Sequence, residues 1–191
     1  MSPSPRPEPE RTPMSFDPQP VLRGELLELR PLRADDFTAL HRAASDPLIW
    51  EQHPEPDRWT EPVFRAYFDE GLASGGALVA IDRSSGEIIG SSRFHGLDAN
   101  AGVVEIGWSF LARAYWGGRY NGEMKQLMLT HAFRWVDRVI FLIGPDNLRS
   151  RRAVEKIGAV LAGTTTDGKG RERVVYELTR AAFGRSDPGA A

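Results

Sequence analysis

Two hydrophobic patterns alternate along residues 21–180 and divide the chain into strands and helices. Alternating or continuous apolar runs of strand length predict strands at 25–32, 76–83, 86–96, 103–111, 138–144, 159–166 and 171–179. Apolar residues at helical spacing predict helices at 33–45, 60–76, 121–136 and 147–158. The order β-α-α-β-β-β-α-β-α-β-β predicts an α/β layer structure, a mixed central sheet with helices on both faces.

Both ends of the chain lack this patterning. Residues 1–20 contain seven of the 14 prolines and few large apolar side chains. Such a segment cannot bury enough surface to offset its ordering entropy, so we expect a disordered tail. A solvated tail is favoured over a docking peptide because no clean PxxP core flanked by apolar residues is present. Residues 181–191 are expected to form a shorter tail, which leaves one domain at 21–180.

Composition narrows the functional classes. The chain has 191 residues, with 24 Lys and Arg against 26 Asp and Glu, and no cysteine. The weak acidic charge argues against nucleic acid or an anionic membrane as the main partner. The missing cysteines exclude disulfides and thiolate chemistry, and the four histidines lack metal-ligand spacing, so no metal is expected. With no long apolar run and no secretion signal, we expect a cytoplasmic protein.

A glycine-containing turn gives the first indication of chemistry. Gly117 and Gly118 lie between the strand at 103–111 and the helix at 121–136. Such a turn directs backbone N–H groups and the helix dipole at one point, which suits a phosphate. No Gly-Lys-Ser/Thr and no GxGxxG follows, so the P-loop and dinucleotide alternatives fail. On its own the turn is explained equally well as a tight strand-to-helix connection.

Four motifs place this turn in a larger context. They are VEIGW at 104–108, YWGG at 115–118, NLRS at 147–150 and EKIGA at 155–159. With them, residues 21–180 resemble the GCN5-related N-acetyltransferase (GNAT) superfamily, most closely the branch that acetylates ribosomal-protein N-termini. The resemblance implies transfer of an acetyl group from acetyl-CoA, as co-substrate, to a primary amine of a protein N-terminus or a small molecule.

The resemblance also implies where acetyl-CoA binds. The family's loop binds the pyrophosphate, the end of the preceding strand presents backbone groups to the pantetheine arm, and the start of the later helix flanks the thiol. The loop positions are Trp116, Gly117, Gly118, Arg119, Tyr120, Asn121 and Gly122. Phe110 and Leu111 correspond to the strand end, and Asn147 and Ser150 to the start of the helix.

Two positions depart from the family pattern. Arg119 stands where the family loop has glycine, and a positive φ there would cost roughly 1–2 kcal/mol. Its side chain has three alternatives: to bind phosphate, to point into solvent, or to crowd the loop and weaken binding, and we favour hindrance over phosphate binding. The tyrosine that many members use to protonate the departing thiolate falls at Val154, and Ser150 is the substitute seen in the ribosomal-protein branch.

Glu105 is the first candidate for the base that accepts the amine's proton. It lies among apolar residues of the strand at 103–111, where partial burial would raise its pKa. Strand alternation places it on the same face as Ser109. The alternative is a structural ion pair with Arg30 or Arg93. His95 is the second candidate, acting through a water molecule.

Acceptor binding is expected between the first two helices. In the family this loop lines the acceptor cleft, and here Trp50, Glu51 and Trp59 could seat and attract a cationic amine. The alternative is that the tryptophans cover helix ends. The sequence does not decide between a monomer and a homodimer. The rival function is a non-catalytic GNAT-like module that binds acyl-CoA, suggested by Arg119 and the missing tyrosine.

Overall fold

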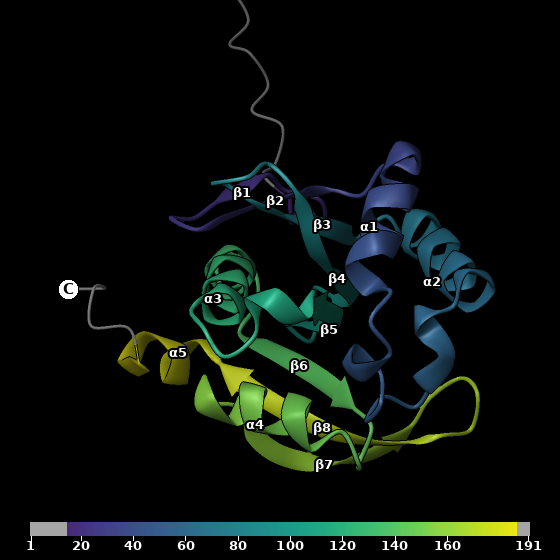
Figure 1. The fold of residues 1–191 in the computed structure, drawn as a ribbon. Coiled ribbons are helices and arrows are strands. Elements are labelled where there is room, and N and C mark those ends of the chain that lie inside the picture. The colour runs from purple at the N-terminus through teal and green to yellow at the C-terminus, as the bar shows by residue number, and fades with distance from the viewer. Residues whose placement is uncertain (1–14, 187–191) are drawn as a thin grey trace, which may run out of the picture.

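The computed structural model describes residues 15–186, which form one eight-stranded sheet covered by helices (Figure 1). The strands are β1 (Leu22–Arg23), β2 (Leu27–Pro31), β3 (Ala77–Asp82), β4 (Ile88–Asp98), β5 (Val103–Leu111), β6 (Arg138–Ile143), β7 (Val160–Thr166) and β8 (Glu172–Thr179). The helices are α1 (Phe37–Ala44), α2 (Glu61–Ser74), α3 (Tyr120–Ala132), α4 (Leu148–Lys156) and α5 (Arg180–Ser186). None of the described helices is long and apolar enough to cross a membrane.

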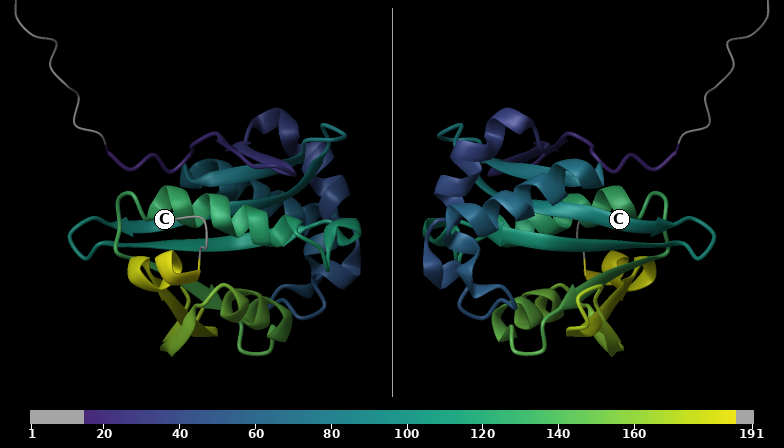
Figure 2. Two further views of the ribbon diagram at one scale, coloured as in Figure 1. Left: turned by 90° about the vertical axis from the view of Figure 1, so that its left-hand side faces the viewer. Right: turned by 90° about the vertical axis from the view of Figure 1, so that its right-hand side faces the viewer.

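The predicted α/β architecture with helices on both faces is confirmed (Figure 2). On one face, α3 and α4 pack through residues such as Met124, Met128 and Val154. On the other face, α1 and α2 pack through residues such as Leu40 and Phe64. These residues belong to the apolar stripes of their helices, and their burial is the main favourable contribution to the fold.

The sheet is divided at its centre. Its order is β1-β2-β3-β4-β5-β6-β8-β7, and neighbouring strands are antiparallel except for β5 and β6. These two pair in parallel only from Val103 to Glu105, against Arg138 to Ile140. Beyond Glu105 no ladder joins them, so the second halves of the two strands diverge. A split of this kind exposes the edges of both strands to a ligand.

A β-bulge lies in β5 next to this split. The β4–β5 register changes from Ser91↔Phe110 to Arg93↔Gly107, so β5 carries one extra residue, and Trp108 has a φ of 52°. One extra residue moves every later side chain to the opposite face. The prediction that Glu105 and Ser109 share a face is therefore wrong: Ser109 contacts Lys125 on the α3 face.

The N-terminal boundary lies earlier than residue 20. The Phe16 ring packs against Phe94 and His131, each with centroids 5.3 Å apart, and the Gln19 amide donates to the Ala77 carbonyl at 3.1 Å. Residues 15–20 thus contact the body of the protein, because one aromatic among the prolines finds an apolar site. Residues 1–14 of the expected tail lie outside the described residues.

The C-terminal boundary also differs from the prediction. Residues 180–186 form α5, and its Phe183 packs on Phe133 with centroids 5.2 Å apart. Residues 181–186 of the expected tail are therefore helical, and residues 187–191 lie outside the described residues. Seven residues with one aromatic give too short an amphipathic pattern to predict a helix.

Candidate active site

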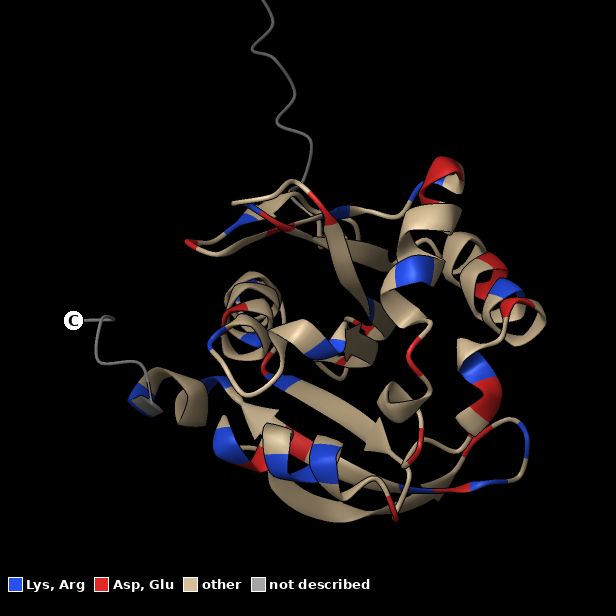
Figure 3. Ribbon diagram, viewed as in Figure 1, with Lys and Arg blue, Asp and Glu red and all other residues tan. Residues whose placement is uncertain are grey.

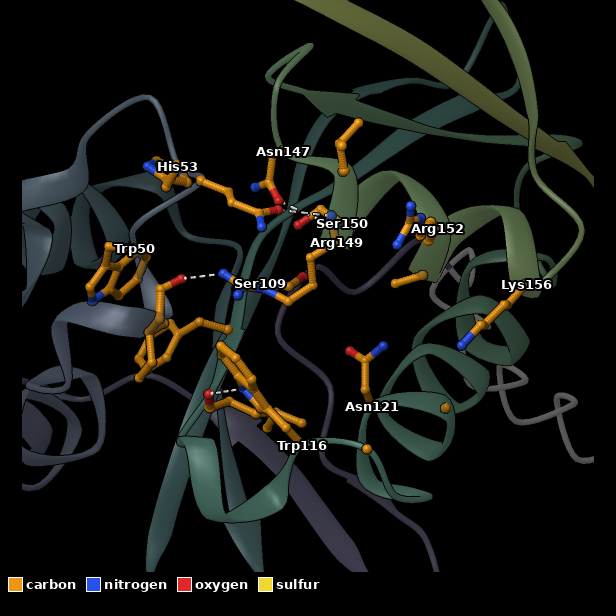
Figure 4. Close-up of a pocket in the computed structure, with 18 of the residues that line it drawn as sticks. Trp50, His53, Ser109, Trp116, Asn121, Asn147, Arg149, Ser150, Arg152 and Lys156 are labelled. Atoms are coloured by element: carbon orange, nitrogen blue, oxygen red, sulfur yellow. Dashed lines mark hydrogen bonds between the residues drawn. The ribbon is translucent and has the colours of Figure 1, made fainter.

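A cavity of about 620 Å³ lies between the end of β5, the start of α3 and the helix α4 (Figure 4). A smaller cavity of about 140 Å³ adjoins it and occupies the split between β5 and β6. The two cavities share seven lining residues: Trp50, His53, Ser109, Asn121, Asn147, Ser150 and Ala153. An elongated ligand in the larger cavity would therefore reach the split in the sheet.

The glycine turn forms one wall of the larger cavity. Gly117 has a φ of 71°, and a Cβ atom placed on Gly117, Gly118 or Gly122 would meet no heavy atom within 4 Å. Glycine thus supplies the left-handed conformation and leaves the backbone open to the cavity. The turn leads into the first residues of α3, whose free N–H groups and helix dipole favour an anion.

The facing wall is basic. Lys and Arg positions mark much of α4 in the ribbon (Figure 3). Arg152 and Lys156 project from this helix toward the side of the cavity that holds Asn121 (Figure 4). With Arg149 they follow helical spacing, so one face of α4 carries three positive charges. None of the expected site residues belongs to this basic face, although the three- and four-residue spacing of its basic residues can be seen in the sequence.

Arg119 does not enter the cavity. Its φ is −78°, so the strain expected for a non-glycine residue is absent, and Gly117 carries the positive φ instead. The Arg119 side chain is 69% exposed and forms an ion pair of 2.5 Å with Glu25. The structure thus agrees with the solvent-pointing alternative, and the expectation that Arg119 crowds the loop gains no support; a phosphate contact by Arg119 stays a prediction.

The side chain of Tyr120 also turns away from the cavity. Its hydroxyl donates to Asp82 on β3 at 2.9 Å, and its ring contacts Tyr115. The geometry therefore lends no support to a role of this side chain in cofactor binding. The other expected loop residues line the larger cavity, as do the residues at the end of β5; they are Trp116, Gly117, Gly118, Asn121, Gly122, Phe110 and Leu111.

The start of α4 lies where the two cavities meet. Asn147 is 8% exposed and caps the helix, since its side-chain oxygen accepts from the backbone N–H of Ser150 at 3.1 Å. Within residues 15–186 the Ser150 hydroxyl has no hydrogen-bond partner, so the alternative of a bond to a backbone carbonyl is not observed. Val154, one turn later, is buried and presents an apolar surface to the smaller cavity.

Glu105 lies behind the wall of the smaller cavity. Its carboxylate approaches Gly107, where a Cβ atom would lie 3.0 Å from Oε1, and Gly107 lines that cavity. Burial raises the pKa of Glu105 to about 7, although Arg93 and Arg173 act to lower it. The alternative ion pair is absent within the described chain, where Arg30 pairs with Asp36 instead.

His95 occupies the position opposite Glu105 on β4. It is exposed, and its ring contacts Trp108 edge-on with centroids 5.1 Å apart. Because it lines neither cavity, its proposed part in catalysis gains no support from the geometry.

Only one of the three expected acceptor residues lines the cavities. Trp50 is 3% exposed, donates to the Ala44 carbonyl at 2.8 Å and lines both cavities. Glu51 is exposed and lies 3.5 Å from Arg149 in an ion pair at the cavity's outer side. Trp59 is 39% exposed and lines neither cavity, so its expected role gains no support from the geometry.

Residues 27–160 match the family model described as an acetyltransferase (GNAT) domain. The chain belongs to the GNAT acetyltransferase family. Its fold is similar to that of a GCN5-related N-acetyltransferase from Brucella melitensis (23% identity, TM-score 0.74, covering 95% of this chain and 85% of that one). It is also similar to that of a GNAT-family acetyltransferase from Bacillus anthracis (23% identity, TM-score 0.68, covering 83% of this chain and 98% of that one). A third similar structure is Mycobacterium smegmatis RimJ, solved in complex with CoA-disulfide (20% identity, TM-score 0.60, covering 81% of this chain and 82% of that one).

The acetyltransferase has a site that fits acetyl-CoA in its chemistry. The open glycine turn, the start of α3 and the basic face of α4 suit a pyrophosphate. The same cavity runs to Asn147 and Ser150, where an acyl group would meet the split in the sheet. Two features suggested the rival function of a non-catalytic module, Arg119 in the loop and the missing tyrosine. The first no longer supports it, because Arg119 leaves the loop unobstructed.

Two further titratable groups of the acetyltransferase reach the smaller cavity and were missed in the sequence. His53 lines both cavities, and burial, followed by the charge of Arg58, lowers its pKa to about 3. Lys125 lies on the buried face of α3 with 5% of its surface exposed. A lysine between Met124 and Met128 breaks the apolar stripe of its helix, which was the signal available in the sequence.

Proposed function

We propose that this enzyme transfers the acetyl group of acetyl-CoA to a primary amine at the split between β5 and β6. The observation that carries the proposal is the continuity of the two cavities. They join the open glycine turn and the basic helix face at one end to the divided sheet at the other, where the buried carboxyl group of Glu105 lies behind the cavity wall. Acetyl-CoA supplies the activated acyl group, and the chain supplies binding, orientation and proton transfer.

The binding residues follow from the lining of the larger cavity. Backbone N–H groups of Gly117, Gly118 and the first turn of α3 bind the pyrophosphate, with charge from Arg152 and Lys156. Trp116 is held in place because its indole N–H donates to the Leu111 carbonyl at 2.8 Å and the Arg149 guanidinium stacks 4.2 Å above its ring. Asn147 and Ser150 flank the thioester.

Glu105 accepts the amine's proton through a water molecule. A bridging water is required because the carboxylate lies behind Gly107 and does not itself line the cavity. A pKa of about 7 leaves a large fraction of the carboxylate ionised at neutral pH while keeping it a stronger base than an exposed glutamate. This basicity suits an α-amine, with a pKa of about 8, better than a lysine side chain at about 10.4.

We therefore propose an acceptor with an α-amine, either a protein N-terminus or a small molecule. A first measurement tests binding: the melting temperature should rise when coenzyme A or acetyl-CoA is added. A second follows thiol release from acetyl-CoA with α-amines, lysine-type amines and no amine. We expect release with at least one α-amine well above the amine-free rate. Release that no amine stimulates would overturn the proposed function.

A further inference from the structure

Lys125 is a buried charge with no carboxylate partner. Within residues 15–186 it forms no ion pair; its Nζ donates to the Ser109 hydroxyl at 2.6 Å and lies 5.5 Å from the centroid of the Phe141 ring. Burying an ammonium group without a counter-charge costs several kcal/mol in general, and a methionine would fill the same space without that cost. A functional reason for a lysine here must lie in what its ammonium contacts.

What it contacts is the cavity-lining hydroxyl of Ser109. The bulge at Trp108 turns Ser109 to the α3 face, where it lines both cavities. Its oxygen accepts from Lys125 and lies 2.7 Å from the Ser92 hydroxyl. A hydroxyl oxygen has two lone pairs and one proton, so a Ser109 oxygen that accepts from both neighbours keeps its own proton to donate. Among the described residues its acceptor is the Gly107 carbonyl at 3.4 Å, a long contact with which a thiolate in the cavity would compete.

Thioester cleavage requires a proton donor at this place. The departing sulfur would otherwise leave as a buried thiolate. The nearby Val154 side chain cannot donate, and the Ser150 hydroxyl has no hydrogen-bond partner within residues 15–186 that could return a proton to it. We propose that Ser109 delivers a proton to the coenzyme A thiolate and that Lys125 then gives Ser109 a new proton. This inference rests on the proposed acetyl transfer. Ser109 is then a catalytic residue, and Lys125 is a positioning residue that acts through it.

The proton and electron balance closes. The amine lone pair forms the C–N bond, the C–S bond breaks, and its electron pair goes to sulfur. The Ser109 O–H proton moves to that sulfur while a Lys125 N–H proton moves to the Ser109 oxygen. The proton lost by nitrogen goes through water to Glu105. Lys125 ends neutral and Glu105 protonated, and both exchange protons with solvent before the next turnover.

The surroundings of Lys125 allow it to exist in both protonation states. Burial alone lowers the pKa of Lys125 to about 7. The titratable and charged groups lining the smaller cavity with it are His53, Arg58 and Arg173. His53 is neutral at pH 7, and the two arginines pair with Glu55 and Asp167, respectively. Glu105 lies on the opposite face of β5.

The test compares pH profiles of kcat for wild type, Lys125→Met, Lys125→Arg and Ser109→Ala. Wild-type kcat should fall as pH rises past about 7, because Lys125 must be protonated. Lys125→Met and Ser109→Ala should lower kcat at pH 7 by about 100-fold or more, and combining them should cost little extra. Lys125→Arg should lower kcat about as much as Lys125→Met and should also lose the falling limb, since arginine stays charged and does not give up a proton.

A purely structural role would give a different result. Lys125→Met and Lys125→Arg would then lower kcat while keeping the wild-type profile, and that outcome, or a Ser109→Ala enzyme with wild-type kcat, overturns the inference. Lys169→Met is the matched control, a lysine on the exposed turn between β7 and β8, and should leave kcat unchanged. Melting temperatures with coenzyme A verify that each variant folds and binds.

A second readout separates this inference from the proposed function. The ultraviolet absorbance of the thiolate gives the thiol pKa of coenzyme A bound to each protein, with no acceptor present. Because Lys125 itself loses its charge near pH 7, the comparison uses Lys125→Arg, whose permanent cation behind Ser109 should lower that pKa by about one unit relative to Lys125→Met. Equal pKa values in the two proteins overturn the inference even if acetyl transfer is found. A lowered value with no acetyl transfer keeps it and rejects the proposed acceptor chemistry.

Discussion

At Glu105, burial and nearby positive charge act in opposite directions on one carboxyl group. Burial dominates, so the pKa rises to about 7 despite Arg93 and Arg173. The sequence allowed this residue to be chosen, since an acidic side chain among apolar neighbours on a strand is unusual. It did not reveal whether an arginine would neutralise it, because that depends on which residues the fold brings within ion-pair distance.

Replacing Glu105 with glutamine should therefore remove one limb of the pH profile. The wild-type carboxyl group accepts a proton only when ionised, so kcat should rise through pH 7, the approximate pKa of Glu105. Glu105→Gln should lower kcat at pH 7 by about 100-fold. The loss should be smaller at pH 9, where more of the amine is already neutral. An equal loss at both pH values in a kcat profile would contradict base catalysis.

Arg119 illustrates the limit of aligning a motif residue by residue. The motif gave its position in the loop but not its φ, and the direction of its side chain follows from φ. We expect Arg119→Gly to leave coenzyme A affinity within about twofold, because the exposed Glu25 ion pair contributes at most about 1 kcal/mol, and to folding rather than binding. Isothermal titration measures this; a clear gain or loss of affinity would mean that the side chain reaches the ligand.

At the scale of elements, most strands and helices were predictable because each buries one regular stripe or face. The bulge in β5 was not, since the apolar alternation of VVEIGWSFL runs on without interruption. Its consequence is functional: it places Ser109 toward α3 and Phe110 toward α2, and so decides which hydroxyl lines the cavities. The divergence of β5 from β6 likewise depends on long-range pairing.

The basic face of α4 gives a prediction at this scale. Arg152→Ala and Lys156→Ala should each weaken coenzyme A binding by about three- to tenfold, and more at low salt, because each removes a positive charge from the cavity wall. Arg65→Ala, on an exposed part of α2, is the matched control. Titrations at two salt concentrations measure the effect, and variants that bind like the control would remove α4 from the phosphate site.

For the molecule as a whole, the packed residues extend past both expected limits, 21 and 180. Both differences have one cause, a single aromatic side chain in a segment that otherwise looks unable to fold. Phe16 and Phe183 each lie in polar or proline-rich surroundings in the sequence, yet each ring packs on the body of the protein. The average composition of a segment predicts whether it can fold by itself. It does not predict whether one of its side chains packs against residues of the folded domain.

Phe16 allows this point to be tested in the full chain. Its ring packs edge-on against the buried Phe94 and beside His131, whose Nε2 is 2.7 Å from the Asp17 carbonyl. Phe16→Ala should lower the free energy of unfolding by about 1–3 kcal/mol, which shifts the melting temperature by several degrees. Val21→Ala, at a side chain 55% exposed, is the control and should cost less than about 0.5 kcal/mol. Coenzyme A affinity should not change, since neither Phe16 nor Phe94 lines the cavities. A Phe16→Ala protein that melts like the control would restore the boundary at residue 20.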